Sequence, residues 1–173
     1  MPVEAVPAMA LSRFNDLRDE DARPLLLACC ASETWVERVL AARPYATVEQ
    51  LLDAAKDISL ALSASDVDEA LSAHPRIGDR AEGGSREATW SRQEQASVGD
   101  ADAAVRARLR EANVAYEQRF GRVFLVRAAG RTPLEILTEA ERRLGNDPDS
   151  EQREVVDQLA QITRLRLAKL LVA

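Results

Sequence analysis

Histidine and cysteine, the side chains most often used for metal binding and for nucleophilic chemistry, are scarce in this chain. Among its 173 residues there is one histidine, His74, and there are two cysteines, Cys29 and Cys30. Because the cysteines are adjacent, they offer neither a disulfide framework nor the ligand spacing of a zinc site. We therefore expect two buried free thiols and no metal centre.

Aromatic residues, positive charge and long apolar runs are also in short supply. Aromatics make up 4% of the chain, whereas Ala, Leu and Arg are plentiful, which favours helix over sheet. The net charge of -6 argues against nucleic-acid binding and against adhesion to anionic membranes. The longest apolar runs, such as residues 25–31, are too short to span a bilayer. The chain starts without a signal-peptide pattern and ends without a peroxisomal Ser-Lys-Leu signal, so we expect a cytoplasmic protein.

The order of proline, glycine and capping residues predicts an all-α fold. These residues divide the chain into about eight helical segments, and strand-like alternation is nearly absent. Thr47 and Thr132 begin capping-box patterns, and Ser65 is an N-cap candidate for the helix that ends near His74. Residues 86–98 are expected to form one helix. The four-residue run 123–126 has no partner strand in the sequence, so we expect an extended connector there.

His74 is the first candidate for chemistry because its side chain exchanges protons near neutral pH. Pro75 disfavours helical geometry at His74, so the imidazole is expected where the chain leaves a helix. A helix C-terminus favours the cationic imidazolium. A lone histidine is nevertheless more often structural than catalytic, so this residue by itself does not establish a site.

Two further features supply possible partners for His74. Ser91, Glu94 and Gln95 lie at i, i+3 and i+4 and therefore share one helix face. In the last helix, Arg166 falls in the middle of an apolar arc at about 100° per residue. A guanidinium aimed at the core must meet an anion or carbonyl groups. The alternatives for Arg166 are a structural ion pair, a side chain that reaches the rim, or a functional role.

Motifs for several enzyme classes are absent. The chain has no Gly-x-Ser-x-Gly sequence, and Gly83-Gly84 lacks the spacing and the lysine of a phosphate-binding loop. The class that remains is general acid–base chemistry on a small anionic substrate, without a cofactor.

Five ordered motifs carry a resemblance to a known family. They are His-Pro-Arg-Ile-Gly-Asp at 74–79, Ser-Arg-Gln-Glu-Gln at 91–95, Asn-x-x-Tyr-x-x-Arg-Phe-Gly at 113–121, Phe-Leu-Val-Arg-Ala at 124–128 with Gly-Arg at 130–131, and Ile-x-x-Leu-Arg-Leu at 162–167. They resemble the motifs of 2-oxo-4-hydroxy-4-carboxy-5-ureidoimidazoline (OHCU) decarboxylases. The resemblance implies one helical domain over residues 1–173, with its core at about 8–171, and a homodimer.

The resemblance also implies site residues. His74 would be the proton donor, and Glu94 and Arg166 would be catalytic as well. The substrate, a ureidoimidazoline carboxylate, would be bound by Pro75, Ser91, Arg92, Gln93 and Gln95 and by the segment Phe124, Leu125, Val126, Arg127 and Ala128, mainly through its backbone groups. The activity implied is cofactor-independent decarboxylation of OHCU to (S)-allantoin, the third step of urate degradation in purine catabolism, with control of the stereochemistry of protonation.

Two other functions remain open on the sequence. A non-catalytic helical adaptor would keep the fold for partner binding, although such a relative is expected to lose His74, Glu94 or Arg166, and all three are present. A related enzyme would act on another small ureido or carboxylate compound. The role of Glu94 is open too: it would either repel or orient the departing carboxylate, or hold His74 in its productive tautomer.

Overall fold

The computed structural model describes residues 8–79 and 82–172. The expectations that concern the first four residues, Ala173 and the start of the Gly-rich connection at 80–85 lie outside the described residues. Among the residues described, no helix combines the length and the hydropathy that a membrane span requires.

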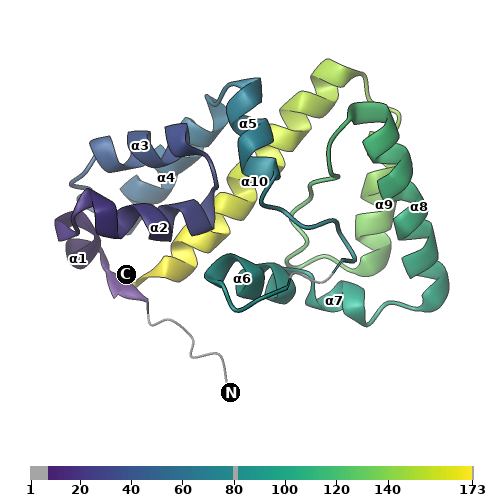
Figure 1. Ribbon diagram of the computed structural model, residues 1–173, viewed down its shortest axis with the longest axis horizontal. Helices are drawn as coiled ribbons and strands as arrows, with labels where there is room; N and C mark the ends of the chain where they lie inside the picture. The colour runs from purple at the N-terminus through teal and green to yellow at the C-terminus, as the bar shows by residue number, and fades with distance from the viewer. Residues whose placement is uncertain (1–7, 80–81, 173) are drawn as a thin grey trace. The chain divides into compact units, whose positions relative to one another are not determined.

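The described chain is mostly helical, which confirms the all-α prediction (Figure 1). Its ten helices are α1 (Leu11–Asp16), α2 (Asp19–Cys29), α3 (Glu33–Ala41), α4 (Val48–Leu60), α5 (Ala64–Leu71), α6 (Arg86–Glu94), α7 (Ala96–Gly99), α8 (Ala103–Phe120), α9 (Pro133–Arg143) and α10 (Pro148–Leu170). Two strands of two residues each, β1 (Met9–Ala10) and β2 (Leu171–Val172), pair in parallel. They are too short to leave a periodic pattern in the sequence.

Several of the helices begin at a side-chain cap. The Thr132 hydroxyl accepts from the Glu135 N–H while the Glu135 carboxylate accepts from the Thr132 N–H, so the predicted capping box is confirmed. The prediction for Ser65 is wrong, because the hydroxyl that caps α5 belongs to Ser63. It accepts from the Asp66 N–H at 3.2 Å, and the Asp66 carboxylate accepts from the Ser63 N–H in return. Either serine fits the sequence pattern, because each has an aspartate three positions later, Asp66 for Ser63 and Asp68 for Ser65.

The helix predicted over 86–98 is two helices, α6 and α7. Gln95 ends the first and precedes the second, with φ -99° and ψ 13°, outside the α-helical range. The run 123–126 is in no strand, as expected for a connector. The division of 86–98 into α6 and α7 accounts for one of the helices beyond the predicted number of about eight.

The described chain divides into two compact units, and the single domain inferred from the resemblance stays a prediction. One unit contains residues up to Ala70 and from Leu159 onward. Its buried side chains include Phe14, Leu26, Trp35, Val36, Leu51, Val67, Ile162 and Leu167. The two cysteines are free and buried in this unit, as predicted, and burial raises the pKa of Cys30 to about 11.

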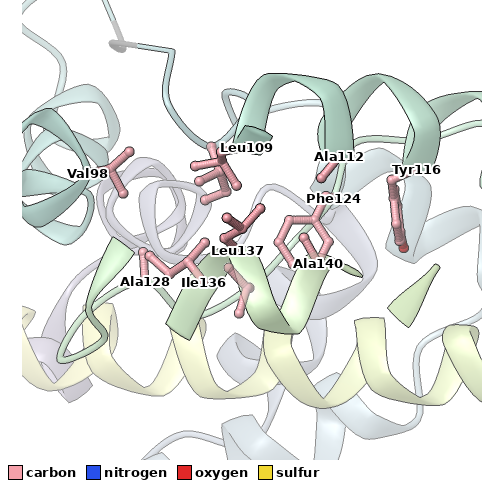
Figure 2. Packing of buried hydrophobic residues seen from close by; sticks show 11 residues of the cluster. Val98, Leu109, Ala112, Tyr116, Phe124, Ala128, Ile136, Leu137 and Ala140 are labelled. Atoms are coloured by element: carbon pink, nitrogen blue, oxygen red, sulfur yellow. The ribbon is translucent and has the colours of Figure 1, made fainter. Parts of the chain in front are cut away.

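The other unit spans Leu71–Gln158. Helices α8 and α9 lie side by side in it (Figure 1). Figure 2 shows the hydrophobic cluster between them, to which α7 adds Val98 and the connector adds Phe124, Val126 and Ala128. The cluster also takes in Ile77, three residues after His74. Three of the five motifs, those at 74–79, 113–121 and 124–128, thus have residues in one core.

Candidate active site

Helix α6 presents the predicted polar face toward the interior of its unit. The Ser85 hydroxyl caps the helix by accepting from the Ala88 N–H at 3.1 Å. Ser91 is 5% exposed, whereas Gln93, two residues later, is exposed. Glu94 and Gln95 are partly buried. The spacing i, i+3, i+4 therefore identified the less exposed side of this helix.

A cavity of about 290 Å³ lies beside this face. Ser91, Arg92 and Gln95 line it from α6 and its C-terminal end, and Gly78 and Asp79 line it from the segment that follows His74. Residues of α7 complete the wall: Ala96, Val98 and Gly99. Polar side chains on one side and small apolar ones on the other suit a small polar ligand with a flat body.

A hydrogen bond joins the two motif segments. The Gly78 N–H donates to Gln95 Oε1 at 3.0 Å, across 17 residues of sequence. Gly78 has φ of 95°, a conformation that residues with a Cβ rarely adopt, so the turn at this position requires glycine. Gln95 thereby fixes the distance between the end of α6 and the turn after His74.

His74 lies just beyond α5, as expected from the sequence. The helix ends at Leu71, and the His74 N–H donates to the Leu71 carbonyl at 3.0 Å. Its side chain is partly exposed. Neither His74 nor Glu94 is among the residues that line the cavity. Glu94 immediately precedes the lining residue Gln95, and His74 lies four residues before the lining residue Gly78.

The segment after His74 is bound to α8. Arg76 donates to Glu117 through Nη2 at 2.9 Å, and Asn113 Nδ2 donates to the Ile77 carbonyl at 2.7 Å. The hydrogen bond and charge of Glu117 raise the pKa of Arg76, and the hydrogen bond from Arg76 lowers the pKa of Glu117. Sequence reasoning quoted Asn113 only as part of a motif and did not identify Glu117. The available signal was their spacing of four residues, which places both on one face of a helix.

The connector at 124–128 is held by its own unit. Phe124, Val126 and Ala128 place their side chains in the hydrophobic cluster, as Figure 2 shows for two of them. The Leu125 carbonyl accepts from Arg143 Nη1 at 2.6 Å, and the Arg127 N–H donates to Gln158 Oε1 at 2.8 Å. The three core side chains are therefore committed to packing, which leaves main-chain groups as the way for these residues to meet a ligand.

Arg166 belongs to the other unit. It is 4% exposed, so the inward direction predicted from the helical wheel is confirmed. Its Nη1 donates to the Ala28 carbonyl at 3.3 Å, and its charge acts on the buried Cys30 thiol, whose pKa it lowers against the larger effect of burial. Arg164, two residues earlier, is exposed enough to pair with Glu49 and Asp53. The place of Arg166 in the site stays a prediction.

Across 8–79 and 82–172, no three His, Cys, Asp or Glu side chains gather as a ligand set.

Comparison with known proteins gives consistent matches. A family model described as OHCU decarboxylase matches residues 15–168. The chain is 27% identical over 162 residues to the 2-oxo-4-hydroxy-4-carboxy-5-ureidoimidazoline decarboxylase of Haloferax volcanii, covering 93% of this chain and 95% of that protein. It is 33% identical over 146 residues to the uric acid degradation bifunctional protein TTL of Arabidopsis thaliana, covering 82% of this chain but only 45% of that protein.

A solved structure matches as well. The crystal structure of OHCU decarboxylase in the presence of (S)-allantoin superposes with a TM-score of 0.72 at 30% identity, covering 89% of this chain and 98% of that chain. The chain thus spans less than half of the plant bifunctional protein and nearly all of the archaeal and crystallised ones.

Proposed function

Since the chain belongs to the OHCU decarboxylase family, we propose that it is a carboxy-lyase that converts OHCU to (S)-allantoin in urate degradation. The observation that carries the proposal is the family match over residues 15–168. A relative that the match covers over 95% of its length bears the decarboxylase name.

The proposed reaction needs no cofactor because the substrate has its own electron sink. The bond between the ring carbon and its carboxylate breaks, and CO2 leaves without the electron pair. That pair delocalises into the adjacent C=N bond and the ring carbonyl. A proton is then donated from one face to the adjacent ureido-bearing carbon, and the hydroxyl on the carbon that lost CO2 releases its proton to become a ring carbonyl, which completes allantoin as a single enantiomer.

Residues of the motifs take the following roles in the proposal. His74 donates the proton to the carbanion and regains one from solvent. Arg166 and main-chain N–H groups of Phe124–Ala128, apart from the Arg127 N–H that donates to Gln158, stabilise the negative charge that develops on ring oxygens, an effect of about 3 kcal/mol for each well-placed donor. Glu94 either directs the departing carboxylate or holds the imidazole of His74, and both roles remain open.

Binding of the substrate is assigned to the two segments that line the cavity. Ser91, Arg92 and Gln95 contribute side chains, and Pro75 shapes the turn beside them. Gln93 is part of the proposed binding set through the motif, although its side chain is exposed. The Arg92 guanidinium also donates to the Gly83 carbonyl at 2.9 Å, which ties the glycine-rich connection to α6.

The proposal extends to a homodimer located in the cytoplasm. Two adjacent buried free thiols fit a reducing compartment. Light scattering of the purified chain measures its oligomeric state, and fractionation of the cells that produce it measures its location.

The test of the reaction uses freshly generated product of urate oxidation and hydrolysis, without added metal or cofactor. Circular dichroism follows the formation of optically active allantoin. We expect a rate well above the spontaneous one and a single enantiomer. Racemic allantoin at the spontaneous rate would contradict the proposal and favour the non-catalytic adaptor, whereas turnover of a different ureido acid alone would favour the related enzyme.

Replacing His74 tests the assignment of the proton donor. In the His74→Asn variant we expect the (S) excess to disappear and the rate to fall by about 10²- to 10⁴-fold, the usual contribution of a positioned general acid. The helix content and the melting temperature serve as controls for folding. Full activity of His74→Asn would show that another group donates the proton.

A further inference from the structure

The segment that follows His74 is held at three successive residues, through the side chain of Arg76 and the backbone of Ile77 and Gly78. Arg76 is ion-paired with Glu117, the Ile77 carbonyl accepts from Asn113, and the Gly78 N–H donates to Gln95. The Ile77 side chain is buried in the cluster between α8 and α9 as well. Residues 76–78, called the strap below, are therefore held in place and do not form a free loop, with two of their three contacts made by α8.

Helix α8 supplies two of these contacts from a single face. Asn113 and Glu117 are four residues apart, so their side chains stand one above the other. Asn113 is 5% exposed, and a buried amide that donates to a buried carbonyl has little freedom to move. Glu117 holds the Arg76 guanidinium through two of its nitrogens, a geometry that fixes direction as well as distance.

His74 lies between this strap and the end of α5. Its own N–H is bound to the Leu71 carbonyl, and Pro75 has a fixed φ. Only Pro75 separates His74 from Arg76. The place of the imidazole therefore depends on where the strap is held.

We infer that Glu117, acting through Arg76, and Asn113, acting through the Ile77 carbonyl, are positioning residues that set His74 for proton transfer. The inference rests on the proposed function, in which His74 protonates the carbanion. Neither residue lines the cavity, so their effect is on geometry and not on contact with the substrate. A displacement of about 1 Å in a catalytic group lowers the rate by about 10²-fold.

The exposed ion pair allows a test that leaves the fold intact. The side chains of Arg76 and Glu117 are 56% and 25% exposed. Pairs of this kind contribute little to stability, so reversing one charge is expected to move the strap without unfolding the unit. The variants are Arg76→Glu, Glu117→Arg and the double swap.

A second ion pair on α8 provides the matched control. Arg108 donates to Glu141 of α9 at 2.7 Å, with side chains 56% and 45% exposed. This pair makes no contact with the strap in the described structure. The control variants are Arg108→Glu, Glu141→Arg and their double swap.

Each single reversal at Arg76 or Glu117 is expected to lower kcat by about 10- to 100-fold with little change in KM, because proton transfer is affected and not binding. The (S) excess should fall as water competes for the carbanion. The double swap should restore kcat to within about fivefold, the remainder reflecting repulsion between the new carboxylate at 76 and Asp79, which faces the Arg76 charge. The control variants should stay within about twofold of the parent.

One spectroscopic readout is independent of turnover. Because the chain has one histidine, the imidazole C–H resonances in a proton NMR spectrum of untagged protein belong to His74. The single reversals should shift these resonances, the double swap should return them, and the control variants should leave them unchanged.

The outcomes separate this inference from the proposed function. Reversals that leave kcat, product handedness and the resonances unchanged would overturn the positioning role while the decarboxylase stands. A loss that the swap does not restore, or that the control pair shares, would overturn it equally. A parent protein that yields only racemic allantoin removes the proposed function, and the inference falls with it.

Discussion

At the scale of single residues, the Gln95 side chain offers a ligand its N–H donors, because its oxygen is already bonded within the protein. Its Oε1 accepts from the Gly78 N–H, which fixes the orientation of the amide and directs the Nε2 hydrogens elsewhere. The side chain also lines the cavity. Gln95 is therefore suited to bind a carbonyl or carboxylate oxygen, and OHCU carries both.

This orientation gives a prediction for Gln95→Glu. A carboxylate would keep the bond from Gly78 but replace the two N–H donors by negative charge. We expect KM for OHCU to rise by about 10- to 100-fold, the loss of a hydrogen bond to a charged group, while the melting temperature stays near that of the parent. Steady-state kinetics and thermal unfolding measure the two quantities.

The control for this substitution is Gln118→Glu, which adds the same charge at an exposed position of α8. Its KM should match that of the parent. An unchanged KM in Gln95→Glu would show that the amide does not meet the substrate.

Single residues were predictable from sequence where periodicity determines burial. Arg166 and Ser91 were found by their places on a helix, and both are buried. The contacts of Gln95 with Gly78 and of Glu117 with Arg76 span 17 and 41 residues. No local pattern encodes such pairs, because they depend on how helices meet.

At the scale of elements, a buried ion pair joins two helices to the connector. Arg143, in the last turn of α9, donates through Nε to Glu151 of α10 at 2.9 Å, and both side chains are fully buried. Tyr116 of α8 donates to the same carboxylate, and Arg143 also binds the Leu125 carbonyl. Burial, followed by the bond to Glu151, raises the pKa of Tyr116. The Glu151 carboxylate thus links α8, α9 and α10 through hydrogen bonds.

The variant Glu151→Gln tests the weight of this pair. It removes the hydrogen-bonded anion of the buried Arg143 and leaves only Glu154, 3.9 Å from Arg143 Nε, so we expect the free energy of unfolding to fall by about 3 kcal/mol. Urea unfolding followed by circular dichroism measures the change.

Glu141→Gln removes an exposed partner of Arg108 instead and should cost less than about 1 kcal/mol. Equal losses in the two variants would mean that burial does not strengthen the Arg143 pair.

Elements were predicted well where caps are local and less well where the interior decides. Thr132 begins α9 as expected from its capping-box pattern, and Gly121 ends α8 with φ of 70°. The break between helices at Gln95 was not predicted. It occurs at a residue whose side chain accepts a hydrogen bond from Gly78, and a local pattern does not indicate a contact across 17 residues. Arg143 gave no signal either, since its partner lies eight residues later in another helix.

At the scale of the whole molecule, acidic side chains with lowered pKa occur in both units. Asp66 is held by hydrogen bonds from Ser63 and Thr34, and Asp147 by Ser150. Hydrogen bonds from Arg142 lower the pKa of Glu139 and of Glu154, as Arg76 does for Glu117. These groups therefore bind protons more weakly in the folded than in the unfolded chain.

The consequence is a loss of stability in acid. A carboxyl group with a lowered folded pKa stabilises the fold above its unfolded value, 4.5 for Glu and 3.8 for Asp, and this contribution is lost as the pH falls through the folded pKa. We expect the urea midpoint to be level between about pH 5 and pH 7 and to fall steadily below about pH 4.5. A midpoint that rises between pH 5 and pH 3 would contradict the prediction.

The fold class followed from composition, since few aromatics and many Ala, Leu and Arg residues favour helices. The division into two units did not. Helix α10 contributes its residues up to Gln158 to one unit and those from Leu159 onward to the other. Its continuous helical pattern does not mark that point.

The positions of the two tryptophans have a consequence for optical measurements. Trp35 is fully buried in the first unit, where its Nε1 donates to the Ala55 carbonyl at 3.1 Å. Trp90 is partly exposed in the second unit, next to Ser91, with the Arg86 guanidinium 5.8 Å from its ring centre. Fluorescence of the chain is thus the sum of a shielded and a more hydrated indole. Variants that keep one indole each would report separately on the melting of the two units.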